Sequence, residues 1–172
     1  MSEWNTPTER LAEIGVSIPE YVPDGTTLSP YVLIGSRLLV TAQPPYAVDG
    51  FSVPRLNLDA NTDADDSLGD LADDHPLRLA LVGARLASIR VLSVAQAAVG
   101  GDLAVISGCV RAVLNLRTGP NFERLGMVFM PVNRIMSTAF GTGPAHSIAG
   151  VAALPGGASM TLETEFRLHR NV

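Results

Sequence analysis

Apolar and polar residues alternate most clearly near the C-terminal end of the chain. Between positions 158 and 168 apolar residues recur at every second position with polar residues between them, which is the two-residue period of a β-strand. The pattern sets Met160, Leu162 and Phe166 against Thr161, Glu163 and Glu165. A Leu-Pro-Gly-Gly turn joins this run to the preceding stretch 146–153, so the sequence predicts an antiparallel pair of strands.

Strand patterns also occur earlier in the chain. Residues 31–34 and 37–42 are β-branched, aromatic and aliphatic runs on either side of Gly35-Ser36, which predicts a hairpin. The apolar run Val105–Leu116 predicts another strand. It contains Cys109, the one cysteine of the chain, for which a buried and inert thiol is the favoured interpretation.

The apolar stretch from Leu77 to Val99 predicts a long helix that is buried on much of its circumference. Asp73 or Asp74 can cap its start, Pro76 stands near its first turn, and Gly100-Gly101 ends it. The stretch is nearly long enough to cross a membrane. Three arginines interrupt it, however, and a central arginine costs about 2.5–3.5 kcal/mol in a spanning helix. We therefore expect a soluble helix and no membrane partner.

Two other segments predict helices. Residues 122–140 form a helical region that Pro131 must break or kink, because proline lacks the N–H that the helix needs. The run Thr6-Pro7-Thr8-Glu9 has the form of a capping box with proline at the first helical position, and Gly15 can end the helix that it starts. A short N-terminal helix is therefore predicted at about 6–15.

The predicted elements follow the order strand, strand, helix, strand, helix, strand, strand. Long helices between strands in this order indicate an α+β architecture, with one mixed sheet and both helices on one face. The chain has 172 residues, 47% of them hydrophobic, which is enough for one domain with a substantial core. We expect a single domain over 1–172, with an enlarged acidic loop at about 46–74.

The enlarged loop contains a pattern similar to a calcium-binding loop. Six oxygen-bearing side chains of 59–70 fall at the spacing that such loops use. Ala64 replaces the glycine that the sharp turn requires, and Asp70 is shorter than the usual bidentate glutamate. A solvated acidic loop is the better interpretation. No two histidines have ligand spacing either, so we expect no metal and no cofactor.

Charge narrows the range of partners. The formal net charge is −5, and no block of basic residues could follow a phosphate backbone, so we expect no nucleic-acid partner. Residues Met1 to Asn5 are polar and lack the features of a secretion signal. One cysteine permits no internal disulfide and fits a reducing compartment. The sequence therefore favours a cytoplasmic protein.

The order of residues near the C-terminal end carries a further signal. From His146 the chain combines a His-Ser pair, a Val-containing strand, Leu-Pro and a strand with Glu-x-Glu. Upstream, the hairpin ends in Thr41-Ala42-Gln43-Pro44-Pro45, and Glu9–Gly15 is followed by Ile18-Pro19. These features resemble the Rid family, the reactive-intermediate deaminases, long described as endoribonuclease-like proteins. That family has Ser-Gly-Gln-x-Pro at the end of the hairpin and an arginine at the position of His146.

The resemblance implies a fold similar to chorismate mutase and a homotrimer with clefts between neighbouring subunits. It also implies an enzyme that hydrolyses a small imine or enamine acid. In such an enzyme the arginine fork holds the carboxylate, while an ordered water attacks the C=N carbon and ammonia is released. A small molecule in the inter-subunit cleft is therefore the expected ligand.

Several positions depart from the family's site. His146 makes at most one of the two parallel hydrogen bonds that an arginine gives a carboxylate. Thr41 keeps a hydroxyl at the family's serine position, and Glu163 matches the second acid of the Glu-x-Glu strand. By the same comparison four other family residues are replaced: tyrosine by Leu28, asparagine by Met130, a frequent cysteine by Ile148 and a water-positioning glutamate by Thr161.

These positions make up the predicted site. His146 is expected to act as acid, base or hydrogen-bond donor, with Thr41 and Thr161 placing water; alternation puts Thr161 and Glu163 on the same face of their strand. The residues expected to bind the substrate are Leu28, Arg111, Met130, Ile148 and Glu163. Arg111, Arg117 or Arg134 could replace the lost arginine, although solvent-facing side chains are the ordinary expectation for all three.

Two interpretations of the function stay open. The first is a Rid-like enzyme whose site is remodelled for a larger or less charged imine, enamine or carbonyl substrate, as in a specialised biosynthetic pathway. The second is a noncatalytic protein that keeps the trimer and uses the cleft to bind a ligand. If the resemblance is set aside, an interface histidine at a loop-to-strand junction is as good an interpretation of His146 as a functional one. Ribonuclease activity disagrees with the acidic charge balance.

Overall fold

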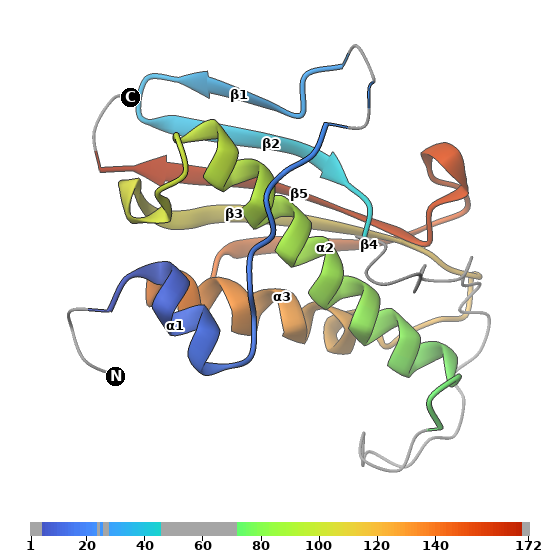
Figure 1. Ribbon diagram of the computed structural model, residues 1–172. Helices are drawn as coiled ribbons and strands as arrows, with labels where there is room; N and C mark the ends of the chain where they lie inside the picture. The colour runs from blue at the N-terminus through green and yellow to red at the C-terminus, as the bar shows by residue number, and fades with distance from the viewer. Residues whose placement is uncertain (1–4, 24, 26–27, 46–71, 170–172) are drawn as a thin grey trace.

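The computed structural model describes residues 5–23, 25, 28–45 and 72–169. Their helices and strands are arranged as Figure 1 shows. The helices are α1 (Pro7–Glu13), α2 (Pro76–Ala98) and α3 (Leu125–Phe140). The strands are β1 (Tyr31–Ile34), β2 (Arg37–Gln43), β3 (Ile106–Arg117), β4 (Ala145–Val151) and β5 (Met160–Leu168). Short 3₁₀ turns, Leu103–Val105 and Pro155–Gly157, precede β3 and β5.

The five strands form one mixed sheet in the order β1-β2-β5-β3-β4. β3 and β4 are parallel, and the other neighbouring strands are antiparallel. α2 packs on β2 and β5 and α3 packs on β3 and β4, so both long helices cover the same face of the sheet (Figure 1). The predicted α+β architecture is confirmed. The opposite face, called the open face below, carries no helix of the described residues.

Side chains alternate between the two faces of the sheet. Most of those that face the helices are buried and apolar: Leu38, Val40, Ala112, Leu114, Leu116, Met160, Leu162 and Phe166. Each large apolar side chain buried in this way stabilises the fold by about 1.5–3 kcal/mol. The charged residues of β5, Glu163, Glu165 and Arg167, fall on the open face, as the alternation predicts.

The predicted antiparallel pairing of 146–153 with 158–168 is wrong. Both segments are strands, but β3 lies between β4 and β5 and pairs with each. The chain crosses the end of β3 between them, where the N–H of Arg117 donates to the carbonyl of Ser159 at 2.8 Å and the N–H of Thr118 donates to that of Val151 at 3.1 Å. Because β5 is buried on its helix side over its whole length, it takes a central place, and the exposed β4 takes the edge.

α2 is capped by a residue other than the predicted aspartates. Nδ1 of His75 accepts a hydrogen bond from the backbone N–H of Leu77 at 3.2 Å. Asp73 instead forms an ion pair with Arg78 at 3.0 Å. The predicted C-terminal stop is confirmed, because Gly100 takes the left-handed backbone conformation, with φ of 76°. In the described part of the chain, α2 included, no helix is long and apolar enough to cross a membrane.

α1 has the capping box that its sequence predicts. The hydroxyl of Thr6 accepts from the N–H of Glu9, and the Glu9 carboxylate accepts from the N–H of Thr6 at 2.7 Å. Arg10 then ties α1 to α3, because its guanidinium donates to the carbonyl oxygens of Thr138 and Ala139 in the last turn of α3. A cation at a helix C-terminus also interacts favourably with the helix dipole.

α3 runs without a break from Leu125 to Phe140, so of the break or kink predicted at Pro131 the break does not occur. It also begins three residues later than the predicted segment. Proline costs a helix interior about 3 kcal/mol, because one backbone hydrogen bond is lost. The buried face of the helix offsets this cost; its members are Val128, Phe129, Val132, Ile135, Met136 and Ala139.

Candidate functional site

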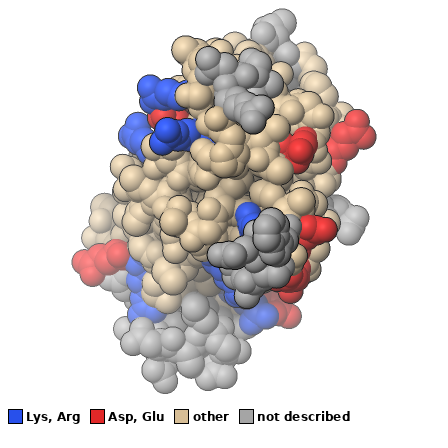
Figure 2. Space-filling model, turned by 90° about the vertical axis from the view of Figure 1, so that its left-hand side faces the viewer, with Lys and Arg blue, Asp and Glu red and all other residues tan. Residues whose placement is uncertain are grey.

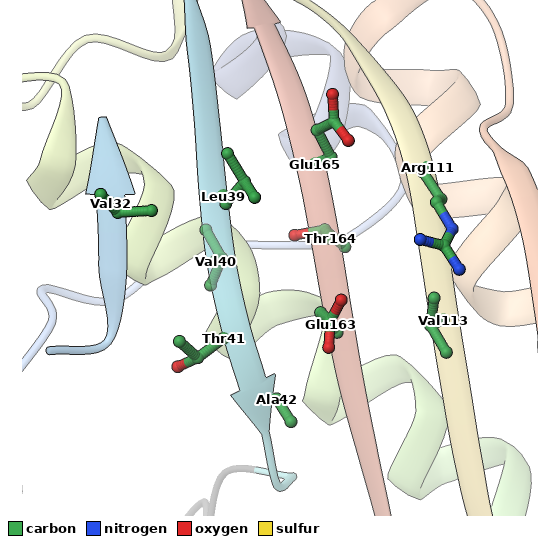
Figure 3. Close-up of a pocket in the computed structure, with 10 residues that line it drawn as sticks. All are labelled: Val32, Leu39, Val40, Thr41, Ala42, Arg111, Val113, Glu163, Thr164 and Glu165. Atoms are coloured by element: carbon green, nitrogen blue, oxygen red, sulfur yellow. The ribbon is translucent and has the colours of Figure 1, made fainter. Parts of the chain in front are cut away.

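A pocket of about 290 Å³ lies on the open face of the sheet, across β1, β2, β5 and β3. Figure 3 shows the residues that line it: Val32, Leu39, Val40, Thr41, Ala42, Arg111, Val113, Glu163, Thr164 and Glu165. The charged groups come from β3 and β5, and the apolar side chains come from β1, β2 and β3. We call this the open-face pocket. Its volume is near the lower end of the range of about 300–1,000 Å³ that small-molecule sites occupy.

A chain of three side chains fixes the Thr41 hydroxyl in the open-face pocket. The hydroxyl donates to the carbonyl oxygen of Pro30 at 3.0 Å. It accepts a hydrogen bond from Nε2 of Gln43 at 3.2 Å. Arg90 of α2 in turn donates from Nε to Oε1 of Gln43 at 3.1 Å. The helix layer thereby orients Thr41, whose oxygen keeps one lone pair for a further donor such as water.

The charged residues of the pocket are not all paired with one another. Arg37 and Glu165 form an ion pair across β2 and β5, in which Nε donates to Oε1 at 2.7 Å. Arg111 stands opposite Glu165 on the neighbouring strand, and Glu163 is two residues away on the same face (Figure 3). Within the described residues, the Arg111 guanidinium and the Glu163 carboxylate make no hydrogen bond or ion pair. The pocket therefore offers one cation and one anion to a ligand.

Three of the predicted site residues, Thr41, Arg111 and Glu163, meet in the open-face pocket. Thr161 lies on the same face of β5, opposite Asn115, but it does not line the pocket and is only 6% exposed. The prediction that Thr161 and Glu163 share a face is confirmed.

His146 and Ile148 lie on the other side of the sheet. His146 pairs with the fully buried Ala112 in the register of β3 and β4, and its ring stacks on Phe129 of α3, with centroids 4.3 Å apart and planes at 19°. Ile148 is two residues further along β4 and packs against the core. The edge strand thus directs both side chains toward the helices, away from Thr41, Arg111 and Glu163.

Leu28 and Met130 are exposed and lie outside the open-face pocket. Leu28 is 79% exposed in the segment before β1. Met130 is 63% exposed and lies on α3 beside residues of α1 and α2. Neither lines the open-face pocket.

Solved structures reveal what the chain is similar to. A putative endoribonuclease from Shewanella oneidensis superposes with a TM-score of 0.76 at 19% identity, covering 95% of this chain and all of that one. A protein of unknown function from Agrobacterium tumefaciens gives 0.74 at 22% identity, covering 95% and 93%. RidA from an Antarctic Psychrobacter gives 0.50 at 17% identity, covering 85% and 92%. This chain has the Rid fold. No protein-family model and no curated protein matches its sequence.

His146 and Arg111 lie on opposite sides of the sheet in this Rid fold. The histidine, which stands where the Rid resemblance expects arginine, lies against Phe129 on the helix side. Of the three arginines considered as replacements, Arg111 lines the open-face pocket. Arg117 lies at the end of β3 outside it, and Arg134 lies on α3. A guanidinium is therefore present on this Rid fold, but on β3 instead of β4.

Metal binding finds no support in the described residues, where no three His, Cys, Asp or Glu side chains come together. The calcium-like sequence 59–70 lies outside the described residues, and so does most of the predicted acidic loop. Figure 2 shows one side of the molecule, on which uncharged residues cover most of the surface and charged side chains form small separate groups. No continuous basic track is present on that side among the described residues.

Sequence reasoning missed several residues that shape the site. Gln43 and Arg90 hold Thr41, and Arg37 pairs with Glu165, but these contacts join residues 47 and 128 positions apart in the chain. The alternation in 37–41 did contain a signal, since Arg37, Leu39 and Thr41 share one face of β2. Only the strand order shows that this face adjoins Glu163 and Glu165.

Proposed function

We propose that this chain is a Rid-fold enzyme that acts on a small reactive imine, enamine or related carbonyl compound. The open-face pocket carries the proposal, because it combines an oriented hydroxyl with a guanidinium and a carboxylate that pair with no other described residue. An imine derived from an amino acid has a carboxylate and, when protonated, an iminium cation. Arg111 matches the first charge and Glu163 matches the second.

The reaction follows from these roles. A water held by the remaining lone pair of Thr41 adds its oxygen to the imine carbon, and the C=N electron pair moves to nitrogen. Glu163 takes the proton that the water loses and returns a proton to nitrogen. Glu163 then moves the hydroxyl proton of the resulting carbinolamine to its nitrogen, the C–N bond breaks as the C=O bond forms, and ammonia leaves behind a carbonyl compound.

We further propose that the protein is a cytoplasmic homotrimer whose ligand binds between subunits. Apolar side chains stand on or beside the open face, with Val32 46%, Ile34 62% and Val110 46% exposed. Large exposed apolar side chains on a sheet face favour a contact with another protein. His146 and Ile148 face the helices, so they take no part in this contact.

The proposal is tested by generating an amino-acid-derived imine in situ with an amino-acid oxidase and following its decay. Wild-type protein is expected to accelerate the decay, and Arg111→Gln is expected to lose most of the acceleration. His146→Ala tests the histidine in the same assay, and His146→Arg tests whether the family's arginine raises the rate. Arg117→Gln, on the same strand but outside the pocket, is the matched control and should behave as wild type. Equal decay with and without wild-type protein over a panel of imines would refute the enzyme.

A noncatalytic binding protein is the second candidate. The apolar lining of the pocket by Val32, Leu39 and Val113, together with the histidine at the Rid arginine position, favours it. Calorimetry or thermal unfolding with stable amino-acid analogues distinguishes the two functions. A ligand at 100 times its Kd stabilises the folded state by about 2.7 kcal/mol. Stabilisation that depends on Arg111, without turnover of any imine, would establish binding alone.

A further inference from the structure

A second hollow lies in the helix layer, on the side of the sheet opposite the open-face pocket. It has a volume of about 410 Å³ and opens between the end of α1, the first half of α2 and the middle of α3. We call it the helix groove. Its lining residues are Ile14, Leu81, Val82, Arg85, Met130, Pro131, Arg134 and Ile135. None of them belongs to the sheet, so the helix groove is separate from the site of the proposed function.

The wall of the helix groove is apolar. Ile135, at its base, is 2% exposed, whereas Met130 on α3 is 63% exposed. A large apolar side chain with that exposure is easily covered by a ligand, and the flexible methionine adapts to different ligand shapes. Covering apolar surface contributes about 25 cal/mol for each Å² removed from water. An apolar chain or ring is therefore the part of a ligand that this wall favours.

The charged residues at the rim of the groove indicate which polar group the ligand carries. Among the described residues, the charged ones that line the groove are Arg85 and Arg134, and none is a carboxylate, although the whole chain has a net charge of −5. Nη2 of Arg85 donates to the carbonyl of Gly15 at 2.8 Å, which holds its guanidinium at the end of α1. Arg134 is exposed, and its guanidinium has no hydrogen bond or ion pair to another described residue. A guanidinium binds a carboxylate through two parallel hydrogen bonds.

We propose that the helix groove binds a small amphipathic carboxylate, with its hydrocarbon chain or ring on Met130 and Ile135 and its carboxylate on Arg85 and Arg134. The two guanidinium groups make the described rim complementary to an acid. The volume lies within the range of about 300–1,000 Å³ for small-molecule sites. The proposal does not rest on imine chemistry, because it shares no residue with the open-face pocket.

Octanoate is the probe for this site, and the methyl signals of methionines report where it binds. In protein labelled at the methionine methyl groups, octanoate below its micelle concentration is expected to shift the Met130 signal in a saturable way. The Met160 signal, from a fully buried side chain of the sheet, should not move. Acetate, which lacks the chain, and octylamine, which carries the opposite charge, should each leave Met130 unshifted at the same concentrations.

Variants separate this site from unspecific binding. Arg85→Gln and Arg134→Gln are each expected to weaken octanoate binding about three- to tenfold, whereas Arg117→Gln at the far end of β3 should leave it unchanged. Equal affinity for octanoate and 1-octanol, or no saturable shift of Met130, would overturn the proposal. So would a change in the native mass of Met130→Asp measured by light scattering, because the groove would then be a contact between copies. Imine turnover by Arg134→Gln stays normal if only the open-face pocket is catalytic.

Discussion

Gln43 has a greater influence on the open-face pocket than its buried position suggests. Its side-chain amide accepts a hydrogen bond from Arg90 on the helix side and donates one to the Thr41 hydroxyl on the open side. The position of the hydroxyl in the pocket is therefore fixed by a residue of α2. Gln43→Met keeps the size of the side chain and removes these hydrogen bonds, together with one from Nε2 to the Thr41 carbonyl oxygen. We expect about a tenfold fall in kcat for imine hydrolysis, equivalent to about 1.4 kcal/mol, with little change in KM, because Gln43 positions Thr41 and does not touch the substrate.

Gln96 of α2 provides the control for this prediction. It is another glutamine of the helix layer, and its side-chain oxygen has no hydrogen-bond partner among the described residues. Gln96→Met should leave both kcat and KM at their wild-type values. If the two variants lose activity equally, Gln43 acts only through general stability.

Cys109 is predicted to make stability depend on alkaline pH. Burial raises the pKa of its thiol to about 12, from an ordinary value of 9.0. Between these values the unfolded thiol ionises and the folded thiol does not, so the free energy of unfolding falls as pH rises above about 9. The loss approaches about 1.4 kcal/mol for each pH unit.

Urea unfolding between pH 7.5 and 10.5 measures this effect. Cys109→Ala removes the thiol, so the variant should lose less stability than the wild type over the upper part of this range. Parallel pH profiles for the two proteins would show that Cys109 is not protected from ionisation by the fold.

At the scale of elements, substitution of Pro131 measures how much this proline costs the stability of α3. Pro131→Ala restores an N–H that can donate to the carbonyl of Met127, four residues earlier. We expect the free energy of unfolding to rise by about 2 kcal/mol, since the gain in helix stability exceeds the entropy that the variant adds to the unfolded chain. Denaturant unfolding checks this value. An unchanged or lower stability would mean that packing of the proline ring compensates for the missing hydrogen bond.

Local patterns predicted the elements themselves with good accuracy. The hairpin of β1 and β2, the capping box of α1, the glycine stop after α2 and the two faces of β5 all depend on neighbouring residues, which the sequence displays directly. The pairing of β4 with β3 was missed because strand patterns do not state which strands become neighbours. The cap of α2 was misplaced because several polar residues precede Pro76, and only the folded backbone selects His75.

The candidate site was predicted less completely than the fold. Thr41, Arg111 and Glu163 meet as expected for a shared pocket. Thr41 and Glu163 lie on β2 and β5, where apolar and polar residues alternate clearly in the sequence. Leu28, Met130, His146 and Ile148 were assigned by position in the chain alone, and the fold directs them elsewhere. The Rid resemblance expects an arginine at position 146, where this chain has histidine. That comparison does not show that Arg111 on β3 brings a guanidinium to a different place on the sheet.

The open face of the sheet governs the predicted assembly of the whole molecule. Ile34 is 62% exposed there, and its replacement by aspartate should weaken contact between copies. Sedimentation of the wild type is expected to give the mass of three 18.1 kDa chains, and Ile34→Asp should shift the protein toward the monomer. Val22→Asp, at a residue 73% exposed outside the sheet, should remain a trimer. A wild-type monomer at micromolar concentration would contradict the trimer.

Recognition of a charged substrate by Arg111 is the central claim of this account, and substrate discrimination tests it most directly. The measurement is kcat/KM for an amino-acid-derived imine and for the imine of the matching methyl ester, which lacks the carboxylate. Wild-type protein is expected to prefer the acid. Arg111→Gln should lose that preference, because its kcat/KM for the acid falls about tenfold or more while its kcat/KM for the ester changes little. The same preference in wild type and Arg111→Gln would contradict the claim, because the carboxylate would then be held elsewhere.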